Sequence, residues 1–274
     1  MKFIFVIAAI AAVVFAFKTN LYVGIVVSLA VLAYAFAKGV PLAYQIKSRK
    51  AFSDGKFDEA KRCYEKALKY LGYTFDSQTE YAYILLRSGD FEKAKNVMDK
   101  LLSHKMKPQN RNLATVQRCM CYYKTGNLDE AYNDALELYN DGYRTMTLYG
   151  LLGYFKILKA PLSDDTFEFC LEAYDYANDD RDICDNLLIC YYNRGEYEKA
   201  KEISDSIIEK EPKFIEAWYH AAQVEAALGN FETAKENLDK ISGCIRSQMT
   251  TISEEDVNKL VDFVDKKLKE KPDA

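Results

Sequence analysis

SGDFEKA (residues 88–94) combines a glycine turn with the start of a helix, and four other segments of the chain repeat its pattern. They are DGKFDEA (54–60), TGNLDEA (125–131), RGEYEKA (194–200) and LGNFETA (228–234). Glycine can adopt the positive φ of a turn between two helices, and an acidic residue just after it favours the N-terminus of the second helix. The pattern therefore predicts a helix-turn-helix unit at each copy.

The spacing of the copies predicts one further unit. The turn glycines, which are 34, 37, 69 and 34 residues apart, are Gly55, Gly89, Gly126, Gly195 and Gly229. The longest gap leaves room for a hidden copy near Pro161, where proline replaces glycine and Ala173 follows twelve residues later. Six units then occupy residues 41–244. A fixed period of this length predicts a solenoid, in which each unit buries its apolar side against the next.

With this period and this glycine-aromatic-alanine corner, residues 41–244 resemble the tetratricopeptide-repeat family. Pro212 and Trp218 match further positions of the family pattern. The resemblance implies an all-α fold, a right-handed α-solenoid of about six helix-turn-helix repeats. The fourth repeat departs from the pattern at Pro161, Ser163 and Thr166. Glu225 also occupies a position where an apolar core residue is expected.

The C-terminal segment predicts a helix that closes the solenoid, at residues 253–270. Ser253 and Asp256 have the spacing of a capping box. The apolar stripe of this helix consists of Val257, Leu260, Val261, Val264 and Leu268. Because a solenoid needs a polar-backed cap, we expect a solenoid domain over residues 41–274 that ends with this helix.

Residues 1–40 predict a separate domain, a transmembrane helical hairpin. Residues 3–17 and 21–37 are uncharged apolar runs separated only by Lys18, Thr19 and Asn20. With their flanking residues, both runs approach the roughly 20 residues that a membrane-spanning helix needs. A cleaved signal peptide is the alternative for residues 1–17, although VFAF at residues 14–17 offers no small-x-small cleavage site.

The charges beside the two runs predict their orientation. Basic residues follow the second run, among them Lys47, Arg49, Lys50 and Lys56. The loop between the runs offers only Lys18, so the positive-inside rule places the solenoid in the cytoplasm and makes the protein a two-span membrane protein. Residues 3–37 would contact lipid. Gly24 and Ser28 would let helices approach closely, either within the hairpin or against another membrane protein.

The family resemblance also indicates a binding site, because first helices line a concave groove in tetratricopeptide-repeat proteins. Candidate partner-binding residues lie two, three and six positions before the turn residue. They are Tyr83, Leu86, Arg87, Met120, Tyr123, Lys124, Phe155, Leu158, Lys159, Ile189, Tyr192 and Asn193. Apolar residues beside cations predict a groove for an extended or helical segment of another protein. Packing between helices and ordinary solvated lysines are the alternative interpretation.

Other classes of function are disfavoured. Beyond residue 50 the chain has 31 basic and 41 acidic residues, a net charge of −10 that repels nucleic-acid phosphates. No glycine-rich phosphate loop, catalytic constellation or metal-ligand cluster is recognisable, so we expect no enzyme activity, no cofactor and no metal site. The seven cysteines contain no C-x-x-C pair and are interpreted as free buried thiols. The adjacent Asp179 and Asp180 are interpreted as turn or helix-capping residues.

Together these features predict a membrane-tethered scaffold or adaptor for protein-protein interaction. The alternative is an assembly or quality-control factor for a membrane or envelope complex, whose hairpin contacts the partner directly. Membrane-anchored tetratricopeptide proteins of lipopolysaccharide assembly are similar in outline, but the paired-cysteine metal module that ends them is missing here.

Overall fold

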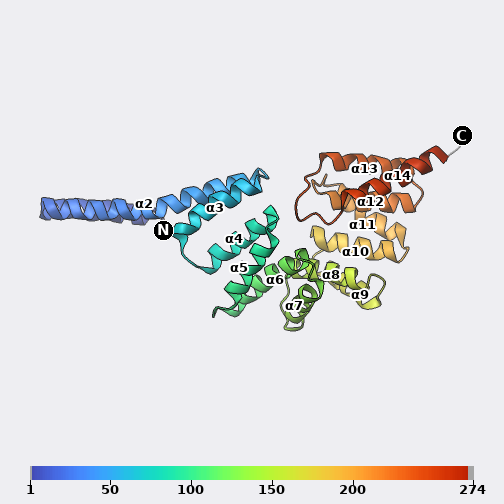
Figure 1. The fold of residues 1–274 in the computed structure, drawn as a ribbon, viewed down its shortest axis with the longest axis horizontal. Helices are drawn as coiled ribbons and strands as arrows, with labels where there is room; N and C mark the ends of the chain where they lie inside the picture. Colours follow the sequence, from blue (N-terminus) through green and yellow to red (C-terminus); the bar gives the residue numbers. More distant parts are fainter. Residues whose placement is uncertain (1, 271–274) are drawn as a thin grey trace. The chain divides into compact units, whose positions relative to one another are not determined.

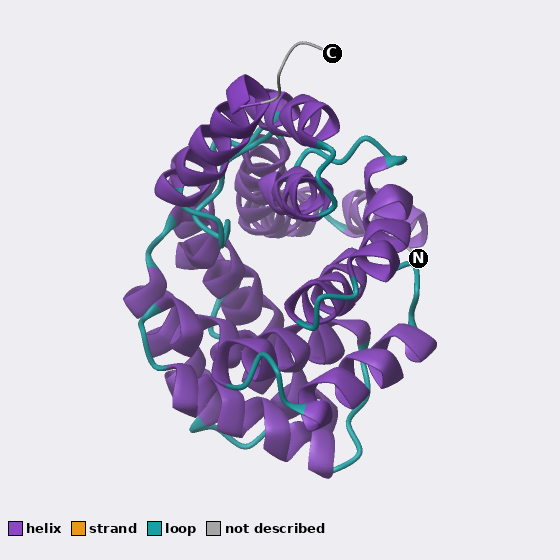
Figure 2. Cartoon of the chain, turned by 90° about the vertical axis from the view of Figure 1, so that its right-hand side faces the viewer, coloured by secondary structure: helices purple, strands orange, loops and turns teal. Residues whose placement is uncertain are grey.

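A computed structural model describes residues 2–270, with side chains from Ala8 onward, and this part of the chain consists of helices joined by loops and contains no strand (Figures 1 and 2). The side chains of residues 3–7 in the first predicted run, and residues 271–274 of the predicted solenoid domain, lie outside the described part. Its helices are α1 (Lys2–Thr19), α2 (Leu21–Ser53), α3 (Phe57–Leu71), α4 (Phe75–Ser88), α5 (Phe91–Leu102), α6 (Pro108–Lys124), α7 (Leu128–Asn140), α8 (Met146–Lys159), α9 (Asp164–Tyr176), α10 (Arg181–Asn193), α11 (Tyr197–Ile208), α12 (Ile215–Ala227), α13 (Phe231–Lys240), η1 (Ile241–Gly243, a 3-10 turn) and α14 (Glu254–Glu270). The chain forms two compact units, Met1–Ile84 and Leu85–Ala274.

The predicted glycine corners are confirmed. Gly126 and Gly229 each have a φ of +82°. The amide after each glycine donates to a carbonyl five residues earlier: Asn127 N to Tyr122 O at 2.9 Å, and Asn230 N to Glu225 O at 2.9 Å. These bonds satisfy carbonyls at the end of the first helix, and the chain turns directly into the second helix.

The hidden fourth unit is also confirmed as a pair of helices, although its corner differs. α8 ends at Lys159, and the amide of Ser163 donates to the carbonyl of Ala160 at 3.2 Å. α9 begins at Asp164, three residues after Pro161, whereas the second helix begins two residues after each glycine. The proline corner is thus one residue longer.

Unit Leu85–Ala274 is held together by apolar side chains shared between successive pairs. Leu152 and Phe155 belong to a cluster that extends from α6 to α10, and Leu188 and Val224 to one that extends from α8 to α12. In both units the alanines five residues after each glycine are fully buried at 0% exposure, Ala60, Ala94, Ala131, Ala200 and Ala234. Their small size lets helices approach, as the sequence predicts.

The structure explains the unexpected Glu225. This side chain is buried, but its carboxylate is paired with Lys201 and accepts a hydrogen bond from Asn230 Nδ2 at 2.8 Å. A buried charge is tolerated when it is paired and hydrogen-bonded. The departure from the repeat pattern is therefore compensated locally.

The closing helix α14 follows its prediction within one residue. The amide of Asp256 donates to Ser253 Oγ at 3.1 Å, and the amide of Ser253 donates to Asp256 Oδ2 at 3.2 Å, which is the predicted capping box. Val264 is fully buried in a cluster with Ala222 and Leu238. α14 therefore covers the apolar end of the last pair.

In unit Met1–Ile84, α1 and α2 pack as a hairpin around a close contact. A Cβ atom on Gly24 would lie 2.3 Å from the Phe17 ring, so glycine makes room for this side chain. The Oδ1 of Asn20 accepts from the amide of Tyr22 at 2.7 Å and caps α2. The small residue Gly24 thus serves packing within the hairpin.

Helix α2 continues without a break past residue 40, where the sequence predicts a domain boundary. Pro41 is buried inside this helix. Proline removes one backbone hydrogen bond from a helix, yet α2 runs on to Ser53 and its last turns pack against α3. The apolar run and the first helix of the first pair are therefore one element. The predicted division of the chain into a membrane domain and a solenoid domain stays a prediction.

Length and composition identify α2 as the one candidate membrane span among the described residues. The apolar part of α1 that is described with side chains, Ala8–Thr19, is shorter. Large apolar side chains on both helices are more than half exposed, Ile10, Phe15, Leu21, Tyr22, Val26, Leu29, Leu32, Tyr34 and Phe36. The two-span arrangement stays a prediction.

The corner geometry predicts the effect of replacing a turn glycine. Gly229→Ala places a side chain at a φ of +82° and should destabilise the chain by about 1–2 kcal/mol, although no atom crowds the new Cβ. Gly243→Ala is the matched control, because Gly243 is equally uncrowded and has no positive φ. Urea unfolding of the full chain, followed by circular dichroism, measures both. Equal stability of the two variants would contradict the proposed role of the corner.

Candidate partner-binding site

The candidate site lies on the first helices of the pairs in unit Leu85–Ala274. α6 contacts α8, α8 contacts α10 and α10 contacts α12, so these helices form a continuous layer. We call the surface of this layer the first-helix face. The predicted site residues from Met120 to Asn193 belong to α6, α8 and α10. Tyr83, Leu86 and Arg87 belong to α4, which spans the division between the two units.

Most of the predicted site residues keep some accessible surface. Leu86 and Phe155 are buried, at 2% and 0% exposure, and can only support the wall of a site. Six are half-buried, Arg87, Met120, Tyr123, Lys124, Ile189 and Tyr192. Four are exposed, Tyr83, Leu158, Lys159 and Asn193. The accessible residues remain candidates for partner contact.

An aromatic cluster forms the centre of the first-helix face. The hydroxyls of Tyr123 and Tyr154 lie 3.1 Å apart, and the rings of Tyr123 and Phe155 have centroids 5.6 Å apart. Burial, together with the hydrogen bond to Tyr123, raises the pKa of Tyr154 well above its usual range. Tyr154, which sequence reasoning missed, therefore stays a neutral hydrogen-bonding group in this cluster.

Lys124 brings a positive charge to the edge of the cluster. Its Nζ lies 5.5 Å from the centroid of the Tyr123 ring and 5.9 Å from that of Phe91. Burial lowers the pKa of Lys124, and the negative charge of Glu216 opposes this change. A partly desolvated ammonium beside aromatic rings is well placed to donate to oxygen atoms of a polypeptide.

The predicted cation Lys159 is arranged differently. Its Nζ pairs with the carboxylate of Asp129 on α7 and lies 5.1 Å from the centroid of the Tyr132 ring. The chain itself therefore compensates this charge. Among the predicted lysines, Lys124 is the better placed to contact a partner.

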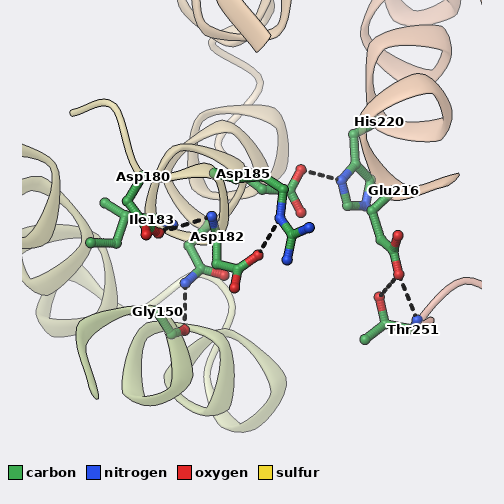
Figure 3. Close-up of polar contacts among 10 residues, drawn as sticks. Gly150, Asp180, Asp182, Ile183, Asp185, Glu216, His220 and Thr251 are labelled. Atoms are coloured by element: carbon green, nitrogen blue, oxygen red, sulfur yellow. Dashed lines mark hydrogen bonds and ion pairs between the residues drawn. The ribbon is translucent and has the colours of Figure 1, made fainter. Parts of the chain in front are cut away.

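The loop between η1 and α14, residues 244–253, also lies on the first-helix face, and we call it the return loop (Figure 1). Lys124 Nζ donates to Met249 O at 3.2 Å and to Thr250 O at 3.5 Å. The amide of Thr251 donates to Glu216 Oε1 on α12 at 2.8 Å (Figure 3). A polypeptide segment thus already occupies part of the predicted site.

A buried ion pair joins α10 and α12 beside this contact. His220 Nδ1 and Asp185 Oδ1 are 2.6 Å apart (Figure 3). Burial tends to lower the pKa of His220, but the charge and hydrogen bond of Asp185 and the charge of Glu216 outweigh it, so the pKa is raised. The pair therefore favours the protonated imidazole and ties the two first helices together.

The remaining polar groups have structural roles. Asp180 caps α10 by accepting from the amides of Asp182 and Ile183, each at 3.1 Å, as predicted (Figure 3). Asn186 Nδ2 donates to Gly150 O at 2.8 Å and links α10 to α8. All seven cysteines are free thiols, and all but Cys244 are buried, as the sequence predicts. Within the described residues, no three His, Cys, Asp or Glu side chains are grouped to hold a metal ion.

The His220 pair predicts a pH-dependent stability. A histidine with a raised pKa stabilises the fold fully below its unfolded pKa of about 6.5, and this contribution is lost as pH rises through the folded pKa. Asp185→Asn should destabilise the chain by about 3 kcal/mol at pH 6, because it leaves His220 without its buried partner. The loss relative to wild type should shrink between pH 6 and pH 8.

Thermal unfolding at both pH values measures this difference. Asp182→Asn is the matched control, since it removes the same charge from an exposed pair with Arg181 on the same helix. A loss in Asp185→Asn that is the same at both pH values would show that His220 is not protonated in the fold.

Sequence comparison finds the repeat in three parts of the chain. Tetratricopeptide-repeat models match residues 47–111, 189–213 and 215–241. These matches lie mainly in the first, second, fifth and sixth pairs. The third pair, whose spacing is longer, and the fourth, with its proline corner, fall largely outside them. No curated protein matches the sequence.

Solved structures with the same fold are distant in sequence. A tetratricopeptide repeat protein from Parabacteroides merdae is 14% identical with a TM-score of 0.55, over 82% of this chain and 99% of its own. TTC0263, a tetratricopeptide-repeat protein of Thermus thermophilus, is 13% identical with a TM-score of 0.55, over 71% and 99%. A human IFIT1 dimer with PPP-AAAA is 18% identical with a TM-score of 0.54, over 69% and 46%. The repeat matches and the shared fold together support the tetratricopeptide-repeat family for this chain.

Proposed function

We propose that the chain is a membrane-tethered interaction scaffold whose first-helix face binds an extended segment of a partner protein on the cytoplasmic side. One observation carries this proposal. A polypeptide backbone, that of the return loop, already lies against the face and receives hydrogen bonds from Lys124. The tetratricopeptide repeats support protein binding in general, because such repeats present surfaces for other polypeptides.

The side chains of the face define the chemistry of the partner segment. Tyr123, Ile189 and Tyr192 are half-buried and offer apolar area that a partner could cover. Such aromatic anchors supply most of the energy of an interface, whereas a cation such as Lys124 fixes orientation. We therefore expect a segment with apolar side chains and with carbonyl or carboxylate oxygens that reach Lys124.

Protein is a better partner for this surface than nucleic acid. The IFIT1 structure contains PPP-AAAA, but residues 51–274 of this chain carry 31 basic and 41 acidic residues, or −10. Binding to a phosphate backbone depends on an excess of lysine and arginine. The pairing of Lys159 with Asp129 removes a further positive charge from the face.

The exposed apolar surface of α1 and α2 supports the membrane tether. Large exposed apolar patches on a protein mark contact with lipid or with another protein. Since α2 continues past residue 40 into the first pair, residues 3–37 in lipid would hold that pair at the membrane surface. Gly24, a small residue at which another membrane helix could approach, is already in contact with Phe17 within the hairpin. This contact supports a role of the hairpin as a tether over direct docking of the hairpin on a partner.

Site-specific photocrosslinking tests partner binding. p-Benzoylphenylalanine in place of Tyr123 should form an adduct with one partner protein, and Lys124→Ala should reduce its yield about tenfold if the lysine makes a charge-assisted hydrogen bond. The same probe at Tyr176, an exposed position on the second helix α9, is the control. The same adducts from both positions, or none from position 123, would count against the proposal.

Cysteine labelling tests the two-span orientation. Lys18→Cys and Lys56→Cys place exposed thiols on opposite sides of the membrane if both predicted helices span it. Cys244→Ser provides the background, because the other native cysteines are buried. In sealed vesicles of known orientation, a membrane-impermeant maleimide should label position 18 from the outer side and position 56 from the cytoplasmic side. Labelling of both from one side would exclude two spans.

A further inference from the structure

We infer that the return loop is an autoinhibitory segment, which occupies the first-helix face and must leave before a partner segment binds there. This inference rests on the proposed function. The loop is a segment of the same chain that covers part of the face. It would make partner binding an exchange of one polypeptide segment for another.

The loop contacts helices that are far apart in the sequence. Its tip packs beside the corner between α4 and α5, where a Cβ on Gly89 would lie 3.2 Å from Gln248 Cγ. Its middle accepts hydrogen bonds from Lys124 on α6, and the amide of Thr251 donates to Glu216 on α12. The loop therefore reaches from the corner of the second pair to the first helix of the sixth pair.

The loop has no buried anchor. Every residue from 244 to 253 is half-buried or exposed, and Ile245 is 62% exposed. α14, in contrast, is fixed by the fully buried Val264. Segments with few buried apolar contacts open at low free energy compared with the whole fold. The loop can thus leave the face while α14 stays docked.

Hydrogen bonds within the loop hold it in a compact shape. Arg246 Nη1 donates to Ile252 O at 3.0 Å, and the amide of Ser247 donates to Thr250 Oγ1 at 3.1 Å. The Met249 and Thr250 carbonyls remain directed at Lys124. Because these bonds join residues of the loop itself, they do not have to break when the loop leaves the face.

The contacts of the loop also indicate which segment could replace it. Lys124 Nζ donates to two adjacent carbonyls, those of Met249 and Thr250. Glu216 Oε1 accepts from both the amide and the hydroxyl of Thr251, at 2.8 and 3.3 Å. A competing segment would offer two adjacent carbonyls to Lys124 and would carry a serine or threonine two residues after the first of them. The loop sequence itself, IRSQMTTIS at residues 245–253, is the simplest such segment.

A binding experiment with that peptide tests the inference. The probe is a fluorescent synthetic peptide of residues 245–253. The receptors are the full chain and a variant whose residues 246–252 are replaced by seven Gly and Ser residues, so that α14 keeps its tether. The peptide should bind the variant at least about tenfold more tightly than wild type, because the face is no longer occupied.

Two substitutions in the loop-replaced variant show where the peptide binds. Lys124→Ala should weaken binding about tenfold or more, since it removes a charged donor to two carbonyls. Lys199→Ala is the matched control, because Lys199 lies exposed on the second helix α11. Equal binding of the peptide to wild type and variant, or no binding to the variant, would overturn the inference.

Intramolecular crosslinking gives a test that needs no loop replacement. p-Benzoylphenylalanine at position 123 of the otherwise native chain should link to residues 246–252, as read by mass spectrometry of the monomer. If the same probe traps a partner but never the loop, the inference fails and the proposed function stands. If it links to the loop but traps no partner, the proposed function fails.

Discussion

Each helical pair of this chain has an apolar side that only the next pair can cover. Gly229 and its counterparts bring the two helices of a pair together, and fully buried alanines such as Ala200 let the next pair approach. The stack needs an end, which α14 provides by burying Val264. Because stability in such a stack comes from neighbouring pairs, local departures are tolerated when they are compensated locally. The proline corner after α8 and the paired Glu225 are two examples.

The same arrangement leaves the first-helix face outside the apolar core, and this is why function is expected there. Tyr123 and Lys124 are only half-buried on that face. The return loop satisfies Lys124 with backbone carbonyls, which is the chemistry that a partner segment would offer. The repeated unit therefore determines both the packing between pairs and the accessible face, and the return loop covers part of that face.

The six helical pairs and the capping box could be predicted from the sequence, because glycine, alanine and acidic residues recur at a fixed spacing and each acts within a few residues. The continuity of α2 through Pro41 could not, since proline usually ends a helix and only the surrounding packing decides otherwise. Among the site residues, Phe155 lies in the core and Lys159 pairs with Asp129, because neighbouring helices determine the direction of each side chain. The path of the return loop has no periodic signal, and its contacts join residues about 35 to 160 positions apart, which local patterns do not encode.

Hydrogen-deuterium exchange of the intact chain tests most directly whether a polypeptide rests on the first-helix face. The amide of Thr251 donates to Glu216 Oε1 on α12 at 2.8 Å. If the loop occupies the face, this amide exchanges more slowly in the chain than in a free peptide of residues 245–253. Exchange at the rate of the free peptide would contradict the account.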